Sequence, residues 1–548
     1  MDNIPPQWQP NYTQLLKDSP GAWSASVAAS PLFQNLPSET LQRVIHLAAG
    51  RHPRKGLAGF AAASSDCHTL ARPFLFMNMY LPAYQVARVP GRHRRIEQSL
   101  IERLSVCTKG INDESIAPYV RNLWIRNPPV PSDPCYRLLH KFTGLRSLHL
   151  DGTRAIFKAT LTFRYILKLS EMDIRYLWIE GFEYRPEITY ESESASADLR
   201  RRHFTARSWR LEQLTLRSIY DTFDVPSQSI SADLLRLCGH IQLFSSDVHP
   251  CLDHLRDYPL PKLQSFQLDS NDCYNRFSRQ WGSTDPLRDH SPRTPIYDGS
   301  FTTQIESLSV NTASISAHHL LSQTFPNIST LQTQISRNAT LLLHFLSLHP
   351  HLNVLSIQHT QPHASRVDEW STFTNSLGTA LHRLPHLRAL QLEIDDEDLT
   401  PAFITALRTL PHLKSLCLGA PEQRAVVAET LESWPAPADS KTESDSDSDA
   451  ELHFPALERL VLDVKRYAYL DTQGAGARPN FDKLTMRNAE KGGFLEWMRL
   501  QAERWGKRCP KLKWILMYRV YSGGMEFVFE GEGDGRRGRA VGGLGGRL

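Results

Sequence analysis

Apolar residues recur along this chain in one short pattern: an apolar residue, two others, a second apolar residue, one other, and a third apolar residue. In Leu387-Arg-Ala-Leu390-Gln-Leu392 the last two apolar positions alternate with polar neighbours, as in a half-buried β-strand. The pattern begins at Val120, Leu145, Ile174, Leu211, Cys238, Leu263, Ile305, Ile328, Leu352, Leu387, Leu413, Leu457 and Leu512, with Thr333 in the third position of the copy at Ile328. About as many matches arise by chance at this apolar content, so the loose pattern alone proves nothing.

A stricter form of the pattern, which includes a proline, separates a repeat from coincidence. The sequence Pro-x-[Leu/Ile]-x-x-[Leu/Ile/Phe] occurs eight times, whereas residue frequencies predict roughly one match. Seven of the matches coincide with the loose pattern and begin at Pro261, Pro326, Pro350, Pro385, Pro411, Pro455 and Pro510, whereas the match at Pro250 does not. Proline cannot continue a helix, so each copy marks the end of a preceding helix. We therefore expect tandem units of helix, proline-containing turn and strand.

Two of these prolines follow a clear helical face, with apolar residues at positions i, i+3, i+4 and i+7. The two faces are Leu377, Ala380, Leu381 and Leu384, and Phe403, Ala406, Leu407 and Leu410. A single helix–strand unit of about 25 residues cannot bury both of its apolar surfaces. Stacked units can, with parallel strands on a concave side and helices on a convex side. The predicted fold class is α/β.

This arrangement resembles the leucine-rich-repeat family over residues 115–520, through its strand pattern. The asparagine or cysteine that usually follows the strand in that family is largely missing here. The long gaps between copies predict insertions at 183–209, 269–300 and 419–454, which are polar, charged or rich in turn-forming residues. We expect these insertions to form loops at the rim of a solenoid, where binding surfaces often lie.

A different pattern occupies the amino-terminal part of the chain. Pro37 suits the first turn of a helix, and one apolar helical face follows it, consisting of Leu41, Val44, Ile45 and Ala48. A second apolar segment covers 57–70, and a strand-like stretch covers 77–81. The pattern predicts a short helical module at 31–85.

This module resembles the F-box family, particularly fungal members in which the box precedes a leucine-rich region. The resemblance is carried by Leu36-Pro37, Glu39, Leu41, Val44-Ile45, Leu70-Ala-Arg-Pro73 and residues Phe74 to Leu81. It implies docking onto the small adaptor subunit of a cullin–RING (SCF-type) ubiquitin ligase. The contacts that it implies are Leu36, Pro37, Leu41, Ile45 and Phe60.

Two interpretations of the module stay open at this point. In the first, the chain is a substrate-recognition adaptor: the module docks onto the ligase and the solenoid binds a protein substrate. In the second, the chain is a leucine-rich-repeat interaction scaffold with no ligase role, and the module only caps the first repeat. Both interpretations make the protein a non-enzymatic binding protein, monomeric before it assembles with partners.

The remaining segments complete the expected organisation of the 548 residues. We expect a disordered amino terminus at 1–30, a linker helix at 86–114, and a flexible glycine-rich tail at 521–548. There is no secretory signal and no long apolar stretch, which indicates a soluble, intracellular protein of the cytoplasm or nucleus. The eight cysteines form no C-x-x-C pair and fit a reducing compartment. Cys417, between two leucines, is expected to be buried.

Residues that could carry chemistry do not form a catalytic or metal-binding pattern. His351, His386 and His412 each stand between the proline and the leucine of a repeat, which indicates a turn position. No metal site, cofactor, nucleic acid or membrane is predicted, because metal-ligand spacings and phosphate-binding loops are missing and the basic patch at 200–207 has only Phe204 and Trp209 near it. The net charge is only +4. The acidic segment 439–451 offers Ser444, Ser446 and Ser448 to acid-directed kinases, or is an unmodified solubilising loop.

Overall fold

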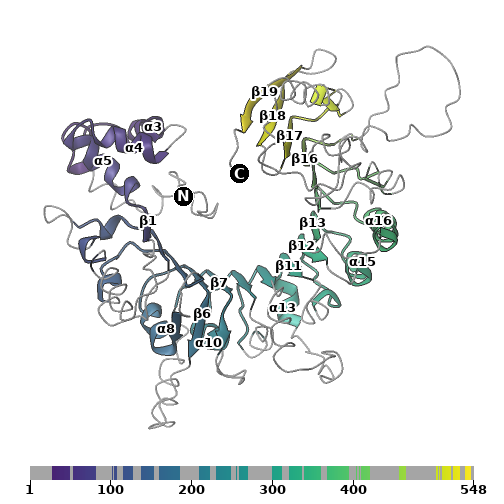
Figure 1. Ribbon diagram of the computed structural model, residues 1–548, viewed down its shortest axis with the longest axis horizontal. Helices are drawn as coiled ribbons and strands as arrows, with labels where there is room; N and C mark the ends of the chain where they lie inside the picture. Colours follow the sequence, from purple (N-terminus) through teal and green to yellow (C-terminus); the bar gives the residue numbers. More distant parts are fainter. Residues whose placement is uncertain are drawn as a thin grey trace, which may run out of the picture. The chain divides into compact units, whose positions relative to one another are not determined.

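The structure is a computed structural model that falls into two compact units, Met1–Leu263 and Gln264–Leu548, which are described one at a time. Figure 1 shows their elements in chain order. The described residues are 27–49, 53–81, 102, 104–107, 115–126, 137–153, 159–185, 209–221, 230–247, 255, 258–268, 299–311, 320–335, 339–359, 367–393, 403, 406–407, 409–419, 454, 456–463, 502–503, 505–506, 509–519, 523–530 and 537–544.

The first unit begins with the predicted helical module. Its helices are α3 (Ser38–Ala49), α4 (Pro53–Ala61) and α5 (Ser65–Leu75), and strand β1 (Asn78–Leu81) follows them. The apolar segment 57–70 is divided between α4 and α5. The Ser64 hydroxyl accepts a hydrogen bond from the Cys67 backbone N–H at 3.0 Å, which caps α5 at its start.

The main sheet of the first unit consists of parallel strands in the order β1-β2-β3-β5-β7-β9. Their bounds are β2 (Asn122–Arg126), β3 (Ser147–Asp151), β5 (Tyr176–Glu180), β7 (Gln213–Arg217) and β9 (Leu243–Ser246). Helices α8 (Phe163–Ser170) and α10 (Ile230–Leu237) lie on one side of this sheet (Figure 1). A 3-10 helix, η2 (Ala117–Tyr119), precedes β2.

A second, smaller parallel sheet lies beyond the carboxyl ends of these strands. It has the order β4-β6-β8, with β4 (Ala159–Thr162), β6 (Phe182–Arg185) and β8 (Tyr220–Asp221). The chain turns from β5 into β6 at Gly181, whose φ is +74°, and from β7 towards β8 at Ser218, whose φ is +50°. Residues 183–185 belong to β6, although the sequence predicts that a loop insertion begins at residue 183.

The second unit continues the same construction. Parallel strands follow in the order β10 (Ser265–Leu268), β11 (Ser307–Asn311), β12 (Thr330–Ile335), β13 (Val354–His359), β14 (Ala389–Glu393), β15 (Ser415–Gly419), β16 (Arg459–Asp463) and β17 (Trp514–Arg519). Helices α13 (Gly299–Gln304), α15 (Ala339–Leu348) and α16 (Val367–Leu381) lie on one side of these strands (Figure 1). Two antiparallel strands, β18 (Gly523–Glu530) and β19 (Arg537–Leu544), complete the sheet.

The predicted repeat is confirmed as a largely parallel sheet whose sequential strands are neighbours. Every predicted first apolar position is buried, with at most 2% of its surface exposed. One register is wrong, however. Leu214 pairs with Phe244 and Leu216 with Ser246, so the residue equivalent to Leu211 is Ile241, three positions after Cys238. Phe244 and Ser246 therefore occupy the two core positions of β9. Because Ser246 is polar, the apolar pattern does not match at the correct register.

Two further expectations differ from the structure. The glycine-rich segment 521–548 is not simply a flexible end, because β18 and β19 form in it and Phe527 and Phe529 are buried. Cys417 is only half-buried, since it pairs in register with Gln391 and Val461, on the opposite face from Leu416 and Leu418. The alternation of a strand places it away from the core.

Candidate functional site

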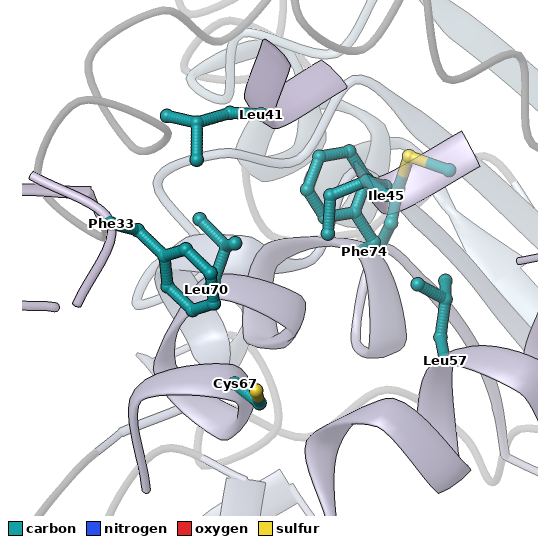
Figure 2. Close-up of a cluster of buried hydrophobic side chains, with 8 residues drawn as sticks. Phe33, Leu41, Ile45, Leu57, Cys67, Leu70 and Phe74 are labelled. Atoms are coloured by element: carbon teal, nitrogen blue, oxygen red, sulfur yellow. The ribbon is translucent and has the colours of Figure 1, made fainter. Parts of the chain in front are cut away.

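The amino-terminal module has a hydrophobic core of its own, to which all three helices and the segment before them contribute. Figure 2 shows the side chains converging between the helices. The buried members are Phe33, Leu41, Ile45, Leu57, Cys67, Leu70, Phe74 and Met77, and Phe60 packs against them half-buried. The rings of Phe33 and Phe60 lie 6.2 Å apart. Packing these side chains together removes the apolar faces of the three helices from water.

The opposite side of α3 carries exposed apolar side chains. Leu47 is 74% exposed and Leu36, just before the helix, is 39% exposed. Thr40 and Arg43 are exposed between them, and the spacing 36, 40, 43, 47 follows one helical face. Leu32 is 63% exposed in the preceding segment. Three of the five large apolar side chains found exposed in the described parts of the chain thus belong to residues 32–47. We call Leu32, Leu36 and Leu47 the exposed leucines.

The five residues that the F-box resemblance implies as contacts divide into two groups. Leu36 and Pro37 are exposed, in the position of a contact surface. Leu41 and Ile45 are no more than 2% exposed, and Phe60 is half-buried, so these three hold the helices together. Contact with an adaptor stays a prediction for all five. Sequence reasoning missed Leu32 and Leu47, although Leu47 lies eleven residues after Leu36, on the same helical face.

A second candidate surface is the face of the sheet that alternates with the core positions, which we call the polar face. In the first unit its central row consists of Tyr80, Trp124, His149 and Trp178, which are neighbours in register. The rings of Trp124 and His149 stack at 4.9 Å, and those of His149 and Trp178 at 4.7 Å. Tyr80 packs on Trp124 at 4.8 Å. Sequence reasoning did not single out this row, because its members lie on four different strands.

Charged side chains form the adjacent row of the same face. Arg126 donates to the Tyr80 hydroxyl at 3.2 Å and pairs with Asp151 at 3.6 Å. Glu180 lies 3.6 Å from His149 Nε2, an ion pair when the imidazole is protonated. Arg217 donates a hydrogen bond to the Ser245 hydroxyl at 3.3 Å. Aromatic and charged side chains that line one face of a rigid sheet are of the types that dominate protein–protein binding energies.

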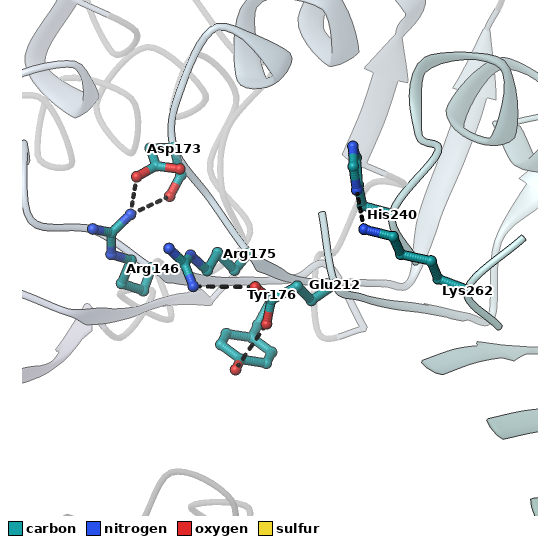
Figure 3. Close-up of polar contacts among 7 residues, drawn as sticks. All are labelled: Arg146, Asp173, Arg175, Tyr176, Glu212, His240 and Lys262. Atoms are coloured by element: carbon teal, nitrogen blue, oxygen red, sulfur yellow. Dashed lines mark hydrogen bonds and ion pairs between the residues drawn. The ribbon is translucent and has the colours of Figure 1, made fainter. Parts of the chain in front are cut away.

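The residues just before the strands form a separate line of polar contacts (Figure 3). Arg146 pairs with Asp173, and Arg175 pairs with Glu212 at 3.1 Å. Lys262 donates to His240 Nδ1 at 3.0 Å. In the second unit Glu458 takes the same position, and the ammonium groups of Lys513 and Lys414 hold the pKa of its carboxyl below the usual value. These exposed pairs contribute little to stability. In the first unit the polar face carries more of the aromatic and charged side chains that could bind a partner.

The polar face of the second unit is made of small and amide side chains. Its central row reads Gln267, Ser309, Gln332, Ser356, Gln391, Cys417, Val461 and Leu516. In the next row the Gln334 amide donates to the Gln358 carbonyl at 3.2 Å. Among the residues of this face that the structure describes, the aromatic side chains are Trp514 and Tyr518 on the last parallel strand, β17.

His349 of the histidine-rich segment is a core residue. Its Nδ1 donates to the Phe345 carbonyl at 2.7 Å, and its Nε2 accepts from the Phe325 N–H at 2.8 Å. Burial lowers the pKa of this imidazole, so the neutral form is favoured. His351, His386 and His412 lie in turns between helix and strand, as predicted.

No group of three or more histidine, cysteine or acidic side chains that could hold a metal ion occurs among the described residues. Within the same residues, no helix has the length and apolar character needed to cross a membrane. The candidate phosphorylation sites Ser444, Ser446 and Ser448, and most of the predicted insertions, lie outside the described residues.

Comparisons with known proteins add no family to these observations. No protein-family model matches the chain, and no curated protein is similar enough in sequence to match it. Function therefore has to be inferred from the module and the two polar faces.

Proposed function

We propose that this chain is a substrate-recognition adaptor of an SCF-type cullin–RING ubiquitin ligase. Its amino-terminal module would act as an F-box that docks onto the small adaptor subunit of the ligase. Its repeats would act as a leucine-rich-repeat solenoid that holds a protein substrate. Such a protein works by proximity: it raises the effective concentration of the substrate near a ubiquitin-charged enzyme and supplies no catalytic group.

The observation that carries the proposal is the division of α3 into two faces. Leu41 and Ile45 complete the core of the module, while Leu36 and Leu47 remain exposed on the other side. Exposed apolar side chains gathered on a folded module mark a protein-binding surface. Burying a fully exposed leucine contributes about 1.5–3 kcal/mol. Leu47, at 74% exposed, would supply most of that on a partner, and Leu36, at 39% exposed, a smaller share.

A second observation supports an adaptor whose two parts keep a fixed relation within the first unit. Strand β1 leaves α5 and pairs directly with β2, and the Met77 carbonyl accepts hydrogen bonds from the N–H groups of Arg121 and Asn122. The Arg72 guanidinium lies over the Tyr119 ring at 5.3 Å. A rigid connection of this kind would hold a bound substrate at a constant distance from the ligase.

The same contacts favour the second candidate function, a repeat scaffold whose module is only a cap. A cap shields the apolar end of the first repeat, and β1 does pair with the edge strand β2. The exposed leucines distinguish the two functions. A cap does not need leucines on its solvent side, whereas a docking module does.

Co-purification of the full chain with a purified ligase adaptor tests the proposal. We expect the wild-type chain to bind, and Leu36→Asp with Leu47→Asp to reduce association by at least about tenfold, because charged groups cannot be buried there. Val106→Asp is a matched control, since Val106 is 60% exposed outside the module. Substitution of Leu41 or Ile45 is a poor test, because it would unfold the module. Wild-type chain that does not bind, or a double variant that binds as well as wild type, would reject the ligase role.

A further inference from the structure

Three turns of the second unit that lead into a strand share one sequence form: proline, a histidine or lysine, leucine, and an arginine or lysine. These turns are 385–388, 411–414 and 510–513. The leucine of each turn is at most 1% exposed. Because it points into the core, the residues on either side of it are left at the surface, and all six of these residues are exposed.

Backbone hydrogen bonds place these turns side by side. The Lys414 N–H donates to the Arg388 carbonyl, and the Glu458 N–H donates to the Lys414 carbonyl, both at 2.8 Å. The Lys513 N–H continues the ladder to the Glu458 carbonyl, also at 2.8 Å. Neighbouring strands lie about 4.8 Å apart, so these positions follow one another in a row just before β14, β15, β16 and β17. We call Arg388, Lys414, Lys511 and Lys513 the basic row.

The four cations of the basic row are accessible. The side chains of Lys414 and Lys513 are 57% and 69% exposed, and both contact the Glu458 carboxylate, at 3.3 and 2.9 Å. Arg388 and Lys511 are exposed as well, and among the described residues neither side chain has an ionic or hydrogen-bond partner. Glu458 alone therefore neutralises part of this row, and two of the cations have no counter-charge.

The charge balance of the surrounding surface is also positive. Among the side chains that the structure describes between residues 382 and 513, the cations are Arg383, Arg388, Lys414, Arg459, Lys511 and Lys513, and the carboxylates are Glu458 and Glu503. Glu503 is half-buried and already has a partner. The equivalent line of the first unit is balanced instead, because Arg146 pairs with Asp173 and Arg175 pairs with Glu212.

We propose that the basic row binds an acidic segment of a partner protein, with aspartate or glutamate side chains on its unpaired cations. Arg388 can hold a carboxylate through two parallel hydrogen bonds, and each lysine adds a positive charge. The exposed rings of His386 and His412, in the same turns, can add N–H donors. Only the description of this partner as a substrate rests on the function proposed above.

The chemistry of the surface favours an acidic polypeptide over other ligands. Single-stranded nucleic acid stacks its bases on exposed aromatic rings, and a membrane surface takes up exposed apolar side chains. Among the described residues of the second unit no large apolar or aromatic side chain is exposed. An apolar segment would remove water from unpaired cations without compensating them. Carboxylates need only the charges that the basic row provides.

Peptide binding to the full chain, measured by fluorescence anisotropy, tests the proposal. The probes are fluorescein-labelled peptides of Glu-Ser, Gln-Ser or Lys-Ser repeats of equal length. We expect the Glu-Ser peptide to bind, the other two to bind at least about tenfold more weakly, and the affinity to fall as salt is added. Arg388→Glu with Lys414→Glu should weaken Glu-Ser binding at least about tenfold, since attraction becomes repulsion.

Two further variants make the test specific to the basic row. Glu458→Gln should strengthen Glu-Ser binding about two- to fivefold, because the neighbouring lysines lose a competing carboxylate. Lys141→Glu with Lys262→Glu is the matched control: both lysines are exposed in the first unit, and the change in net charge is the same. This control should keep the wild-type affinity within about twofold. Glu458→Gln stays informative if the double variant of the basic row unfolds.

Several results would overturn the proposal. These are no binding of the Glu-Ser peptide, equal binding of the Gln-Ser peptide, an equal loss in the control, or no gain in Glu458→Gln. Equally tight binding of an oligothymidylate of the same charge would mean a general polyanion surface. A chain in which the acids of 439–451 are changed to amides is assayed alongside. Peptide binding seen only in that chain would assign the row to the chain's own acidic segment instead of a partner.

The test is separate from that of the ligase role, since it uses no ligase component. Loss of adaptor co-purification with Glu-Ser binding intact rejects the ligase role alone. Intact co-purification without Glu-Ser binding rejects the basic row as a binding surface and leaves the ligase role standing.

Discussion

The two units build the same parallel sheet and line its polar face in opposite ways. The first unit places rings and charges there, with Trp124, His149 and Trp178 stacked at intervals of 4.9 and 4.7 Å. The second unit places mainly serine and glutamine on the described strands β10 to β14, where the Gln334 amide donates to the Gln358 carbonyl. Because strand pairing repeats at about 4.8 Å, any side chain in one row meets its equivalent on the next strand. The backbone provides the spacing, and the residue types decide whether the row stacks rings or joins amides.

The cores of the two units differ in a related way. Each unit fully buries a titratable side chain, Asp233 in the first and His349 in the second. Asp233 accepts a hydrogen bond from the Tyr184 hydroxyl at 2.5 Å and pairs with Arg236 at 3.3 Å. His349 is bound by two backbone groups instead. A buried charge needs partners of its own, whereas a neutral imidazole can link two segments of backbone.

The largest expected effect comes from removing the buried carboxylate. Asp233→Ala should lower the free energy of unfolding by about 3 kcal/mol, because the buried Tyr184 hydroxyl loses its hydrogen bond to Asp233 and Arg236 loses its ion pair with Asp233. Tyr184→Phe should lower it by about 1 kcal/mol, since the hydrogen bond to Asp233 is lost while the Asp233–Arg236 pair remains. Urea denaturation followed by circular dichroism measures both. Equally small decreases in the free energy of unfolding for both variants would show that the contacts of Asp233 contribute little to the stability of the first unit.

The corner between β5 and β6 gives the next largest effect. Gly181→Ala should cost about 2 kcal/mol, since Gly181 has a positive φ and an added Cβ would lie 2.4 Å from the Thr153 backbone nitrogen. Ser218→Gly at the corresponding corner after β7 is the matched control. Glycine suits its φ of +50°, so thermal stability should stay unchanged or rise slightly. A loss of stability in Ser218→Gly as large as that in Gly181→Ala would contradict the explanation from backbone conformation.

Acid should destabilise the second unit through His349. Burial lowers the pKa of this imidazole in the folded state, so below the unfolded pKa of about 6.5 the unfolded chain takes up a proton that the folded chain does not. Stability then falls by up to about 1.4 kcal/mol for each pH unit below 6.5. At higher pH both states are neutral and the effect vanishes.

Denaturation midpoints between pH 7 and pH 5 measure this effect. The decrease should be smaller in His349→Gln than in wild type, although the variant starts from a lower stability because a core contact is lost. His386→Gln, at an exposed turn position, should keep the wild-type slope. An unchanged slope in His349→Gln would contradict the assignment of a neutral, buried imidazole.

The smallest effect is expected for the ion pairs before the strands. The pKa of Glu458 is lowered by Lys513 and Lys414, so its contribution is present above the unfolded pKa and is lost as pH falls through the folded pKa. Because the group is exposed and screened by salt, Glu458→Gln should leave the melting temperature nearly unchanged at physiological salt. A clear decrease would show that this row stabilises the sheet more than surface pairs usually do.

The repeat itself was predictable because core positions leave a strong pattern in sequence. A leucine at the first apolar position, with a proline two residues before it, correctly predicted strands such as β14 and β15. In these two strands Leu390 and Leu416 are neighbours in register. The pattern failed at β9, where Ser246 fills a core position. It also failed at β18 and β19, because glycine-rich strands pair through their backbone and carry few side chains that show the alternation.

The candidate surfaces were only partly predictable. An apolar helical face in sequence does not say which residues face the module's own core, so Leu41 and Ile45 were grouped with the exposed Leu36. The row that contains Trp124, His149 and Trp178 joins residues separated by roughly one repeat. Each is an ordinary strand residue until parallel register is known. The register depends on how the strands pair, and a single sequence gives little information about that pairing.

Amide hydrogen exchange of the full chain, with and without saturating ligase adaptor, tests the central claim most directly. The account predicts slower exchange in peptides that cover 36–49, with no change in the repeat strands at 389–419. Unchanged exchange at 36–49 under saturating adaptor, or protection confined to the repeats, would contradict an F-box role for the amino-terminal module.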